Sequence, residues 1–323
     1  MLLKSARNMG LADRKNTKIT PFYFSHDHHK RKETAMKTTE IFKRKRCFSF
    51  EVFPPKRTAP VESIYGTLEE LAALKPDFIS VTYGAGGSQS SYTLEIASKI
   101  KNDYKTESVA HLPCLYLTEE SAADILAKMD SLGIENVLAL RGDRAADCEP
   151  EGRFHHANEL VSFIKEKNKN INILAACYPE THPQAESSIA DIHNLKRKVD
   201  AGADHLVSQL FFDNSFFYDF WEKAKIAGIN VPVEAGIMPV VNKKQIERMV
   251  SLCGASLPQK FLNMMNRYEN SPEAIRDAGI AYAVDQIVDL ITNGVDGIHL
   301  YTMNNPYIAR RISEAVRSII EAE

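Results

Sequence analysis

Glu51 is a charged residue within a strongly apolar segment, residues 47–53 (CFSFEVF), which two prolines follow directly. A carboxyl group among aromatic side chains loses hydration, and this loss disfavours the ionised form. We therefore expect the Glu51 carboxyl to be protonated at neutral pH, which is the state that a general acid requires. The alternative is a side chain that points from an edge strand into water.

Other residues that could do chemistry stand at the ends of short apolar runs. Residues 141–144 (RGDR) place charges on both sides of a glycine, which fits an anion clamp beside a carboxylate. Residues 84–88 (GAGGS) would let a large ligand approach the backbone, although a plain flexible loop fits equally well. His111 lies inside an apolar run, where a core histidine is the commoner interpretation, and Gln209 ends another run.

A polar stripe is predicted on one helix. Asp191, Asn194 and Lys198 recur at positions i, i+3 and i+7, and Arg197 lies beside them. Opposite charges with an amide suit a diphosphate and a ribose or adenine edge. A solvated helix face is the plainer alternative.

These residues must be positioned by a repeating pattern of short β-branched runs, polar turns and amphipathic helices. The expected strands are residues 47–53, 78–83, 108–115, 136–140, 171–177, 205–211, 231–236 and 297–301. The expected helices are residues 67–74, 121–132, 157–167, a segment from 189 to about 202, 216–227, 243–252, 258–266, 272–293 and 306–320.

About eight strand–helix units without a linker predict a single-domain (β/α)8 TIM barrel with extra helices before the last strand. A doubly wound open sheet is the alternative, but prolines replace the glycine-rich turn that would follow its first strand. In a barrel the C-terminal strand ends form the site, so Glu51, Asp143 and Gln209 would meet there.

The composition is that of an ordinary globular protein: 323 residues, 44% hydrophobic and 25% charged, with a formal net charge of -2. Nothing in it favours nucleic acid or a membrane as partner. The five cysteines form no C-x-x-C pair, which predicts reduced thiols in a cytoplasm, with Cys114 and Cys177 in the core. We assign no metal site.

Residues 1–35 are basic and polar and show no hydrophobic period. We expect a disordered extension, which a wrongly assigned start codon would explain, with Met36 as the true start. Residues 36–323 would then form the catalytic domain.

Seven stretches together resemble the methylenetetrahydrofolate reductase family. They are residues 48–56 (FSFEVFPPK), 80–88 (SVTYGAGGS), 138–143 (LALRGD), 178–183 (YPETHP), 194–202 (NLKRKVDAG), 209–213 (QLFFD) and 297–304 (GIHLYTMN). They follow the family's order over residues 45–320. The resemblance implies a barrel that binds FAD and reduces 5,10-methylenetetrahydrofolate to 5-methyltetrahydrofolate for methionine synthesis or one-carbon metabolism.

The resemblance also implies roles for individual residues. Glu51 would protonate folate N10, and Asp143 would stabilise the cationic iminium that forms when the ring opens. The implied FAD contacts are Thr82, His111, Arg141, Gly142, Asp143, Ala157, Tyr178, His182, Asp191, Asn194, Arg197 and Lys198. The implied folate contacts are Asp143, Gln209 and Gln245. Hydride would pass from N5 of the reduced flavin to the iminium carbon.

The chain departs from some bacterial members at two positions. Met249 stands where they have an aromatic residue that stacks nicotinamide or folate, and Asn305 stands near an arginine that meets the folate tail. The electron donor is therefore NADH, NADPH or, as an alternative, a ferredoxin or partner flavoprotein. The family suggests a homo-oligomer, and we expect no C-terminal regulatory domain and no control by S-adenosylmethionine.

Two further classes of function stay open. One is a different barrel flavoenzyme, such as a proline dehydrogenase-like protein, although this does not account for Glu51, Asp143 and Gln209 together. The other is a non-catalytic binding subunit of a larger complex, against which the presence of Glu51 argues.

Overall fold

The computed structural model describes residues 36–56, 58–83, 90–144 and 152–322. The expectations for residues 1–35, for the glycine-rich residues 84–88 and for Cys148 lie outside these residues.

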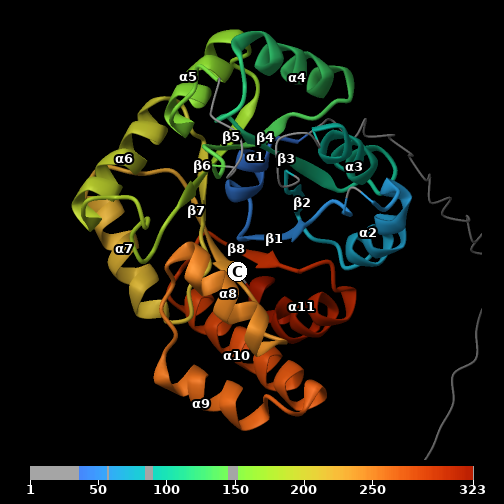
Figure 1. Ribbon diagram of the computed structural model, residues 1–323, viewed down its shortest axis with the longest axis vertical. Helices are drawn as coiled ribbons and strands as arrows, with labels where there is room; N and C mark the ends of the chain where they lie inside the picture. Colours follow the sequence, from blue (N-terminus) through green and yellow to red (C-terminus); the bar gives the residue numbers. More distant parts are fainter. Residues whose placement is uncertain (1–35, 57, 84–89, 145–151, 323) are drawn as a thin grey trace, which may run out of the picture. The chain divides into compact units, whose positions relative to one another are not determined.

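Eight parallel strands close into a barrel in the order of the sequence, each hydrogen-bonded to the next and the last to the first. The strands are β1 Cys47–Val52, β2 Phe78–Val81, β3 Glu107–Pro113, β4 Asn136–Leu140, β5 Asn172–Cys177, β6 His205–Ser208, β7 Val233–Ile237 and β8 Gly297–Tyr301. They gather at the centre of Figure 1, and the helices surround them. The barrel prediction is confirmed, and the open doubly wound sheet is wrong.

The helices follow the predicted rhythm with boundary shifts of a few residues. They are α1 Thr38–Phe42, η1 Val61–Ile64, α2 Tyr65–Ala72, α3 Ser90–Asn102, α4 Glu119–Ser131, α5 Ala157–Lys167, α6 Ser188–Asp200, α7 Asn214–Ile226, α8 Lys243–Cys253, α9 Gln259–Tyr268, α10 Pro272–Thr292 and α11 Pro306–Ile320. The extra helices α8 to α10 before β8 lie together in the lower part of Figure 1. Helix α3 was not predicted, and its hydrophobic residues at 94, 96, 97 and 100 follow a helical pattern that gives it a buried face.

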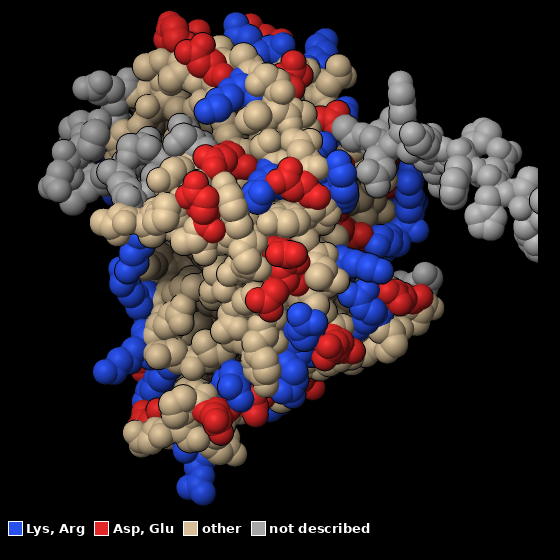
Figure 2. Space-filling view, turned by 90° about the vertical axis from the view of Figure 1, so that its right-hand side faces the viewer, with Lys and Arg blue, Asp and Glu red and all other residues tan. Residues whose placement is uncertain are grey.

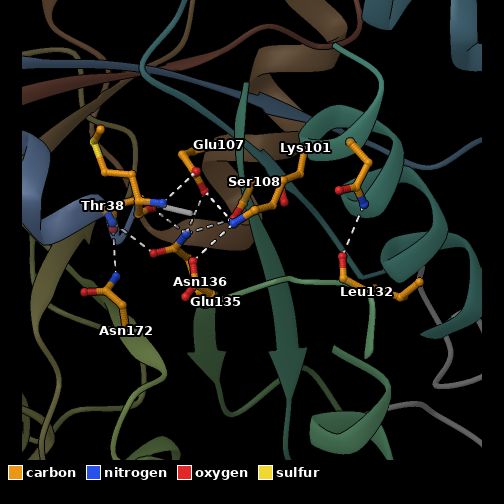
Figure 3. A network of polar contacts seen from close by, with 10 residues as sticks. Thr38, Lys101, Glu107, Ser108, Leu132, Glu135, Asn136 and Asn172 are labelled. Carbon is orange, nitrogen blue, oxygen red and sulfur yellow. Dashed lines mark hydrogen bonds and ion pairs between the residues drawn. The ribbon is translucent and has the colours of Figure 1, made fainter. Parts of the chain in front are cut away.

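Helix α1 covers the N-terminal ends of the strands. Its Ile41 and Phe42 pack with the first apolar residues inside the barrel, including Phe78 and Leu174. Thr38 is fully buried and reaches two polar strand starts (Figure 3): its backbone N–H donates to Asn136 Oδ1 at 2.9 Å, and its hydroxyl accepts from Asn172 Nδ2 at 2.7 Å. The site must therefore open at the other end of the barrel.

Replacing Asn136 with alanine should destabilise the protein by about 2–3 kcal/mol, because the buried N–H of Thr38 loses its acceptor. Urea unfolding measures this change. Asn230→Ala is the control, since Asn230 is exposed, and its cost should stay below about 0.5 kcal/mol. Equal effects of the two substitutions would show that Asn136 does not anchor α1.

The surface shows no strong charge bias on the face in Figure 2, where basic and acidic side chains are interspersed. Among the described residues no helix is long and apolar enough to cross a membrane. The three cysteines at positions 47, 114 and 177 are free and buried, as expected for the last two.

Candidate active site

Glu51 lies at the C-terminal end of β1 and is only 7% exposed. The strand pairs with β2 on one side and β8 on the other, so it has no free edge. The expectation of a buried carboxyl is confirmed, and the alternative of an edge residue pointing into water is wrong.

Two buried histidines face the Glu51 carboxyl. Its Oε2 lies 3.4 Å from His111 Nε2 and 3.6 Å from His299 Nε2, and neither nitrogen has a hydrogen-bond partner among the described residues. Burial lowers the pKa of His111 to about 4, although the charge of Glu51 acts in the opposite direction. At neutral pH His111 is therefore uncharged, and its contact with Glu51 is not an ion pair.

The lowered pKa of His111 has a consequence for stability. An unfolded histidine titrates near pH 6.5 and the folded His111 near pH 4, so the unfolded chain binds more protons between these values. The free energy of unfolding that the neutral His111 contributes is fully present above pH 6.5. It falls by roughly 3 kcal/mol as the pH falls towards 4. Urea unfolding from pH 7 to 4 should show a flatter decline for His111→Gln than for the native protein. Parallel curves would contradict this assignment.

The loop between β8 and α11 holds the end of β1 in place. The Thr302 hydroxyl donates to the Glu51 carbonyl at 2.6 Å. Asn304 pairs with both backbone groups of Phe53, donating to its carbonyl and accepting from its N–H at 2.8 Å each. Met303 and Asn304 adopt positive φ angles of 51° and 55°, a strained arrangement that is common around functional sites.

A pocket of about 190 Å³ opens beside this loop. Gln245, from the first turn of α8, lines it together with Tyr301, Met303 and Asn305. Asn305 also caps α11 by accepting the N–H of Ile308 at 3.3 Å. Of the residues that line this pocket, Gln245 was predicted from the sequence as a folate contact and Asn305 as a position near the folate tail. The structure brings these two residues to one pocket.

Two further residues named for ligand binding lie on other elements, Gln209 at a strand end and Met249 in α8. Gln209 follows β6 and turns its Oε1 back to the N–H of Leu210 at 2.9 Å, so its amide nitrogen has no partner among the described residues. Met249 is partly buried and packs with the apolar cluster around α8 and α9.

The residues after β4 lie near the start of the loop after β5. Gly142 has a φ of +86°, and a Cβ there would stand 2.8 Å from Pro113 Cβ. Glycine therefore allows the chain after β4 to approach the end of β3 closely. Arg141 donates to Gln184 of the next loop. Asp143 is exposed, and its charge adds to burial in raising the pKa of Tyr178 to about 12.

The polar stripe on α6 has two half-buried members and two exposed ones. Asp191 accepts the backbone N–H of His182 at 2.8 Å, and Lys198 Nζ donates to the Ala176 carbonyl at 2.8 Å. Burial lowers the pKa of Lys198. Asn194 and Arg197 are exposed. The stripe is therefore anchored to the end of β5 and is not simply a solvated face.

The remaining candidate positions border the same end of the barrel. Thr82 follows β2 directly, and its carbonyl accepts from the Thr93 hydroxyl at 3.0 Å. Ala157 begins α5 and is buried. The rings of Tyr178 and His182 meet edge to face, with centroids 4.6 Å apart.

The sequence did not single out several residues that contact or hold the Glu51 strand. His299, Ser49, Thr302 and Asn304 belong to this set. The signal was available in the alternation of polar residues along two paired strands, at positions 49 and 51 and at positions 299 and 301.

Comparisons with known proteins agree on one family. A family model described as "Methylenetetrahydrofolate reductase" matches residues 36–317. "Methylenetetrahydrofolate reductase (NADH) 1" of Arabidopsis thaliana is 38% identical over 272 residues, covering 80% of this chain and 46% of that protein. The chain thus spans about half the length of this plant relative.

Bacterial relatives match over most of their length. "5,10-methylenetetrahydrofolate reductase" of Pectobacterium carotovorum subsp. carotovorum is 34% identical over 264 residues, covering 82% of this chain and 88% of that protein. The protein of the same name from Escherichia coli (strain K12) is 35% identical over 257 residues, with coverages of 79% and 86%.

A solved structure shares the fold. It is an uncharacterized protein from Clostridium thermocellum, described as binding two copies of 5-methyl-5,6,7,8-tetrahydrofolic acid. The TM-score is 0.64 at 13% identity, covering 88% of this chain and 99% of that one.

Proposed function

Since the chain belongs to the methylenetetrahydrofolate reductase family, we propose that it reduces 5,10-methylenetetrahydrofolate to 5-methyltetrahydrofolate with FAD as cofactor. The observation that carries this proposal is Glu51, a buried carboxyl at the C-terminal end of β1 whose neighbour His111 is uncharged at neutral pH.

Glu51 is the general acid in this proposal. Opening of the folate imidazolidine ring requires a proton at N10, and a neutral carboxylic acid can donate it at pH 7. The backbone around Glu51 is fixed by Thr302 and Asn304, so its position does not depend on a flexible loop. Rigid placement of the acid supports this role.

Asp143, Gln209 and Gln245 would bind and polarise the folate. Ring opening leaves a cationic iminium at N5, which the exposed carboxylate of Asp143 would stabilise. The amide nitrogen of Gln209 can donate to the pterin, whose edge presents both donors and acceptors, while its Oε1 accepts from Leu210. Gln245 and Asn305 line the pocket in which the remainder of the folate would lie.

The donor set around β4, β5 and α6 fits FAD. Arg197 and Asn194 offer exposed polar groups on α6, while Asp191 and Lys198 hold that helix against the end of β5. The same region is bordered by Arg141, Tyr178 and His182. The other implied FAD contacts lie around it: Thr82, His111, Gly142 and Ala157. When bound, FAD supplies the hydride that reduces the iminium carbon. The protein positions and polarises the reactants.

NADH is the electron donor that we favour, because the name of the Arabidopsis relative includes it. A ferredoxin or partner flavoprotein is the second candidate. Met249 supports it, since this side chain packs into an apolar cluster and cannot stack a nicotinamide as an aromatic ring would.

An anaerobic experiment separates these possibilities. The purified protein is loaded with FAD and mixed separately with NADH, NADPH and reduced ferredoxin, and the loss of flavin absorbance is followed. We expect NADH to bleach the flavin fastest. A protein that fails to bind FAD would overturn the cofactor assignment, and bleaching by ferredoxin alone would select the second donor.

A further inference from the structure

A second carboxyl lies inside the barrel below Glu51. Glu234 of β7 is fully buried, and its Oε1 lies 2.7 Å from Ser49 Oγ on β1. Since β7 and β1 are not paired strands, this contact crosses the barrel interior. Gly297 of the intervening β8 leaves the space, because a Cβ there would stand 2.9 Å from Glu234 Cγ. A buried carboxylate persists only where hydrogen-bond donors surround it.

One N–H group that points towards Glu234 comes from the α1 end of the barrel. The Thr38 hydroxyl accepts from Asn172 and lies 3.4 Å from His205 Nδ1, so its own hydrogen can point to that nitrogen. His205 then carries its ring hydrogen on Nε2, which lies 3.6 Å from Glu234 Oε2. This arrangement directs an N–H towards the Glu234 carboxyl, but at 3.6 Å the two atoms form no hydrogen bond.

Ser49 links Glu234 to the site above it. Its Oγ lies 2.7 Å from Glu234 Oε1 and 2.7 Å from His299 Nδ1. The Ser49 hydroxyl has one hydrogen, and it donates this hydrogen to Glu234 Oε1. His299 Nδ1 must then donate to Ser49, and His299 Nε2, which has no hydrogen-bond partner among the described residues, faces Glu51 Oε2 at 3.6 Å.

The other groups around the two carboxyls do not supply a positive charge. Tyr301 donates its hydroxyl to the Ser208 carbonyl at 2.7 Å, and burial, followed by the charge of Glu51, raises its pKa well above the usual value. Beside Glu234, burial and then the charge of Glu234 raise the pKa of the Cys47 thiol. His111 is uncharged at neutral pH. Among the described residues, neither carboxyl pairs with a lysine or arginine.

We propose that Glu234 is a positioning residue: acting through Ser49, it fixes His299 in the tautomer protonated on Nδ1 and so turns an unprotonated Nε2 towards the Glu51 carboxyl. A bare imidazole nitrogen repels the lone pairs of an ionised carboxylate and attracts the hydrogen of a protonated one. The consequence for catalysis rests on the proposed role of Glu51, whereas the direction of the hydrogen bonds does not.

Nitrogen-15 NMR of histidine side chains tests the tautomer in the ligand-free, full-length protein at pH 7. His299→Gln assigns the His299 signals by their disappearance. We expect the pattern of a neutral ring protonated on Nδ1. In Glu234→Met the acceptor is gone, Ser49 can donate to His299, and the proton should move to Nε2. An Nε2-protonated His299 in the native protein, or an unchanged tautomer in Glu234→Met, would overturn the proposal.

Ser49→Ala provides a second variant, because it breaks the same link without altering Glu234. It should give a mixture of tautomers at His299. Ser108→Ala is the matched control: Ser108 is a buried strand serine whose hydroxyl has no hydrogen-bond partner among the described residues. Its spectrum should equal that of the native protein, and a tautomer change there would show that any buried cavity disturbs His299.

The folate reaction gives an independent reading. The rate at which methylenetetrahydrofolate reoxidises the reduced flavin should fall about tenfold in Glu234→Met at pH 7, the equivalent of one hydrogen bond. The rate should recover at lower pH, while flavin reduction stays unchanged. A pH-independent loss would indicate a merely structural role and contradict the proposal. If native protein with the expected tautomer leaves the flavin reduced, the proposed function fails and the positioning of His299 stands.

Discussion

Glu51→Gln should lower the rate of flavin reoxidation by methylenetetrahydrofolate by about 10²- to 10⁴-fold, the range typical of a lost general acid. Glutamine has nearly the same shape and can still form hydrogen bonds in the buried site, but it cannot give a proton to folate N10. Reduction of the bound flavin by NADH requires no such proton and should proceed at the native rate. Stopped-flow absorbance measures the two half-reactions separately.

Glu62→Gln is the matched control for this experiment. It makes the same chemical change in η1, at an exposed position outside the site, and should leave both half-reactions unchanged. Folate turnover that survives in Glu51→Gln would show that another group donates the proton. Loss of both half-reactions would indicate damage to the FAD site instead.

Gly279→Ala should destabilise the protein by at least about 3 kcal/mol. Gly279 is buried in α10 against the loop that follows β7, and a Cβ there would stand 1.7 Å from the Val240 carbonyl oxygen. Because that neighbour is backbone, α10 would have to move away from the barrel. The same loop borders the pocket through Pro239 and Val241, so folate binding should weaken as well. Urea unfolding and folate titration measure these effects.

Gly66→Ala is the control for this substitution. Gly66 is exposed in α2, and a Cβ there meets nothing within 4 Å. Alanine favours the helix and restricts the unfolded chain, so the protein should gain about 0.5–1 kcal/mol. Changes of opposite sign in the free energy of unfolding for the two substitutions would support tight packing of α10. A small effect at Gly279 would mean that α10 can shift without loss.

The barrel could be predicted from the sequence because its strands are short apolar runs separated by amphipathic helices. Positions that depend on local pattern, such as β4 and α5, were predicted to the residue. Predicted strands ran too long where apolar residues continue beyond the ladder, as after β6, where Leu210 and Phe211 are buried outside the strand. Apolar character reports burial, whereas the end of a strand depends on its neighbours.

The site was predictable where chemistry marks a single residue and unpredictable where it depends on contacts across the barrel. Glu51 was conspicuous as a charge among apolar residues, and its burial was foreseen. The pairing of Ser49 with Glu234 joins residues 185 positions apart and exists only because the barrel closes. Likewise, Asn304 clamps Phe53 from a distant part of the chain. Sequence spacing carries no information about such contacts.

One measurement tests the proposed function most directly. The protein is loaded with FAD, reduced anaerobically by light with EDTA as the sacrificial electron donor, and mixed with 5,10-methylenetetrahydrofolate. We expect the flavin absorbance to return as one equivalent of 5-methyltetrahydrofolate forms, independently of the natural electron donor. A flavin that stays reduced, with the folate recovered unchanged, would contradict the account.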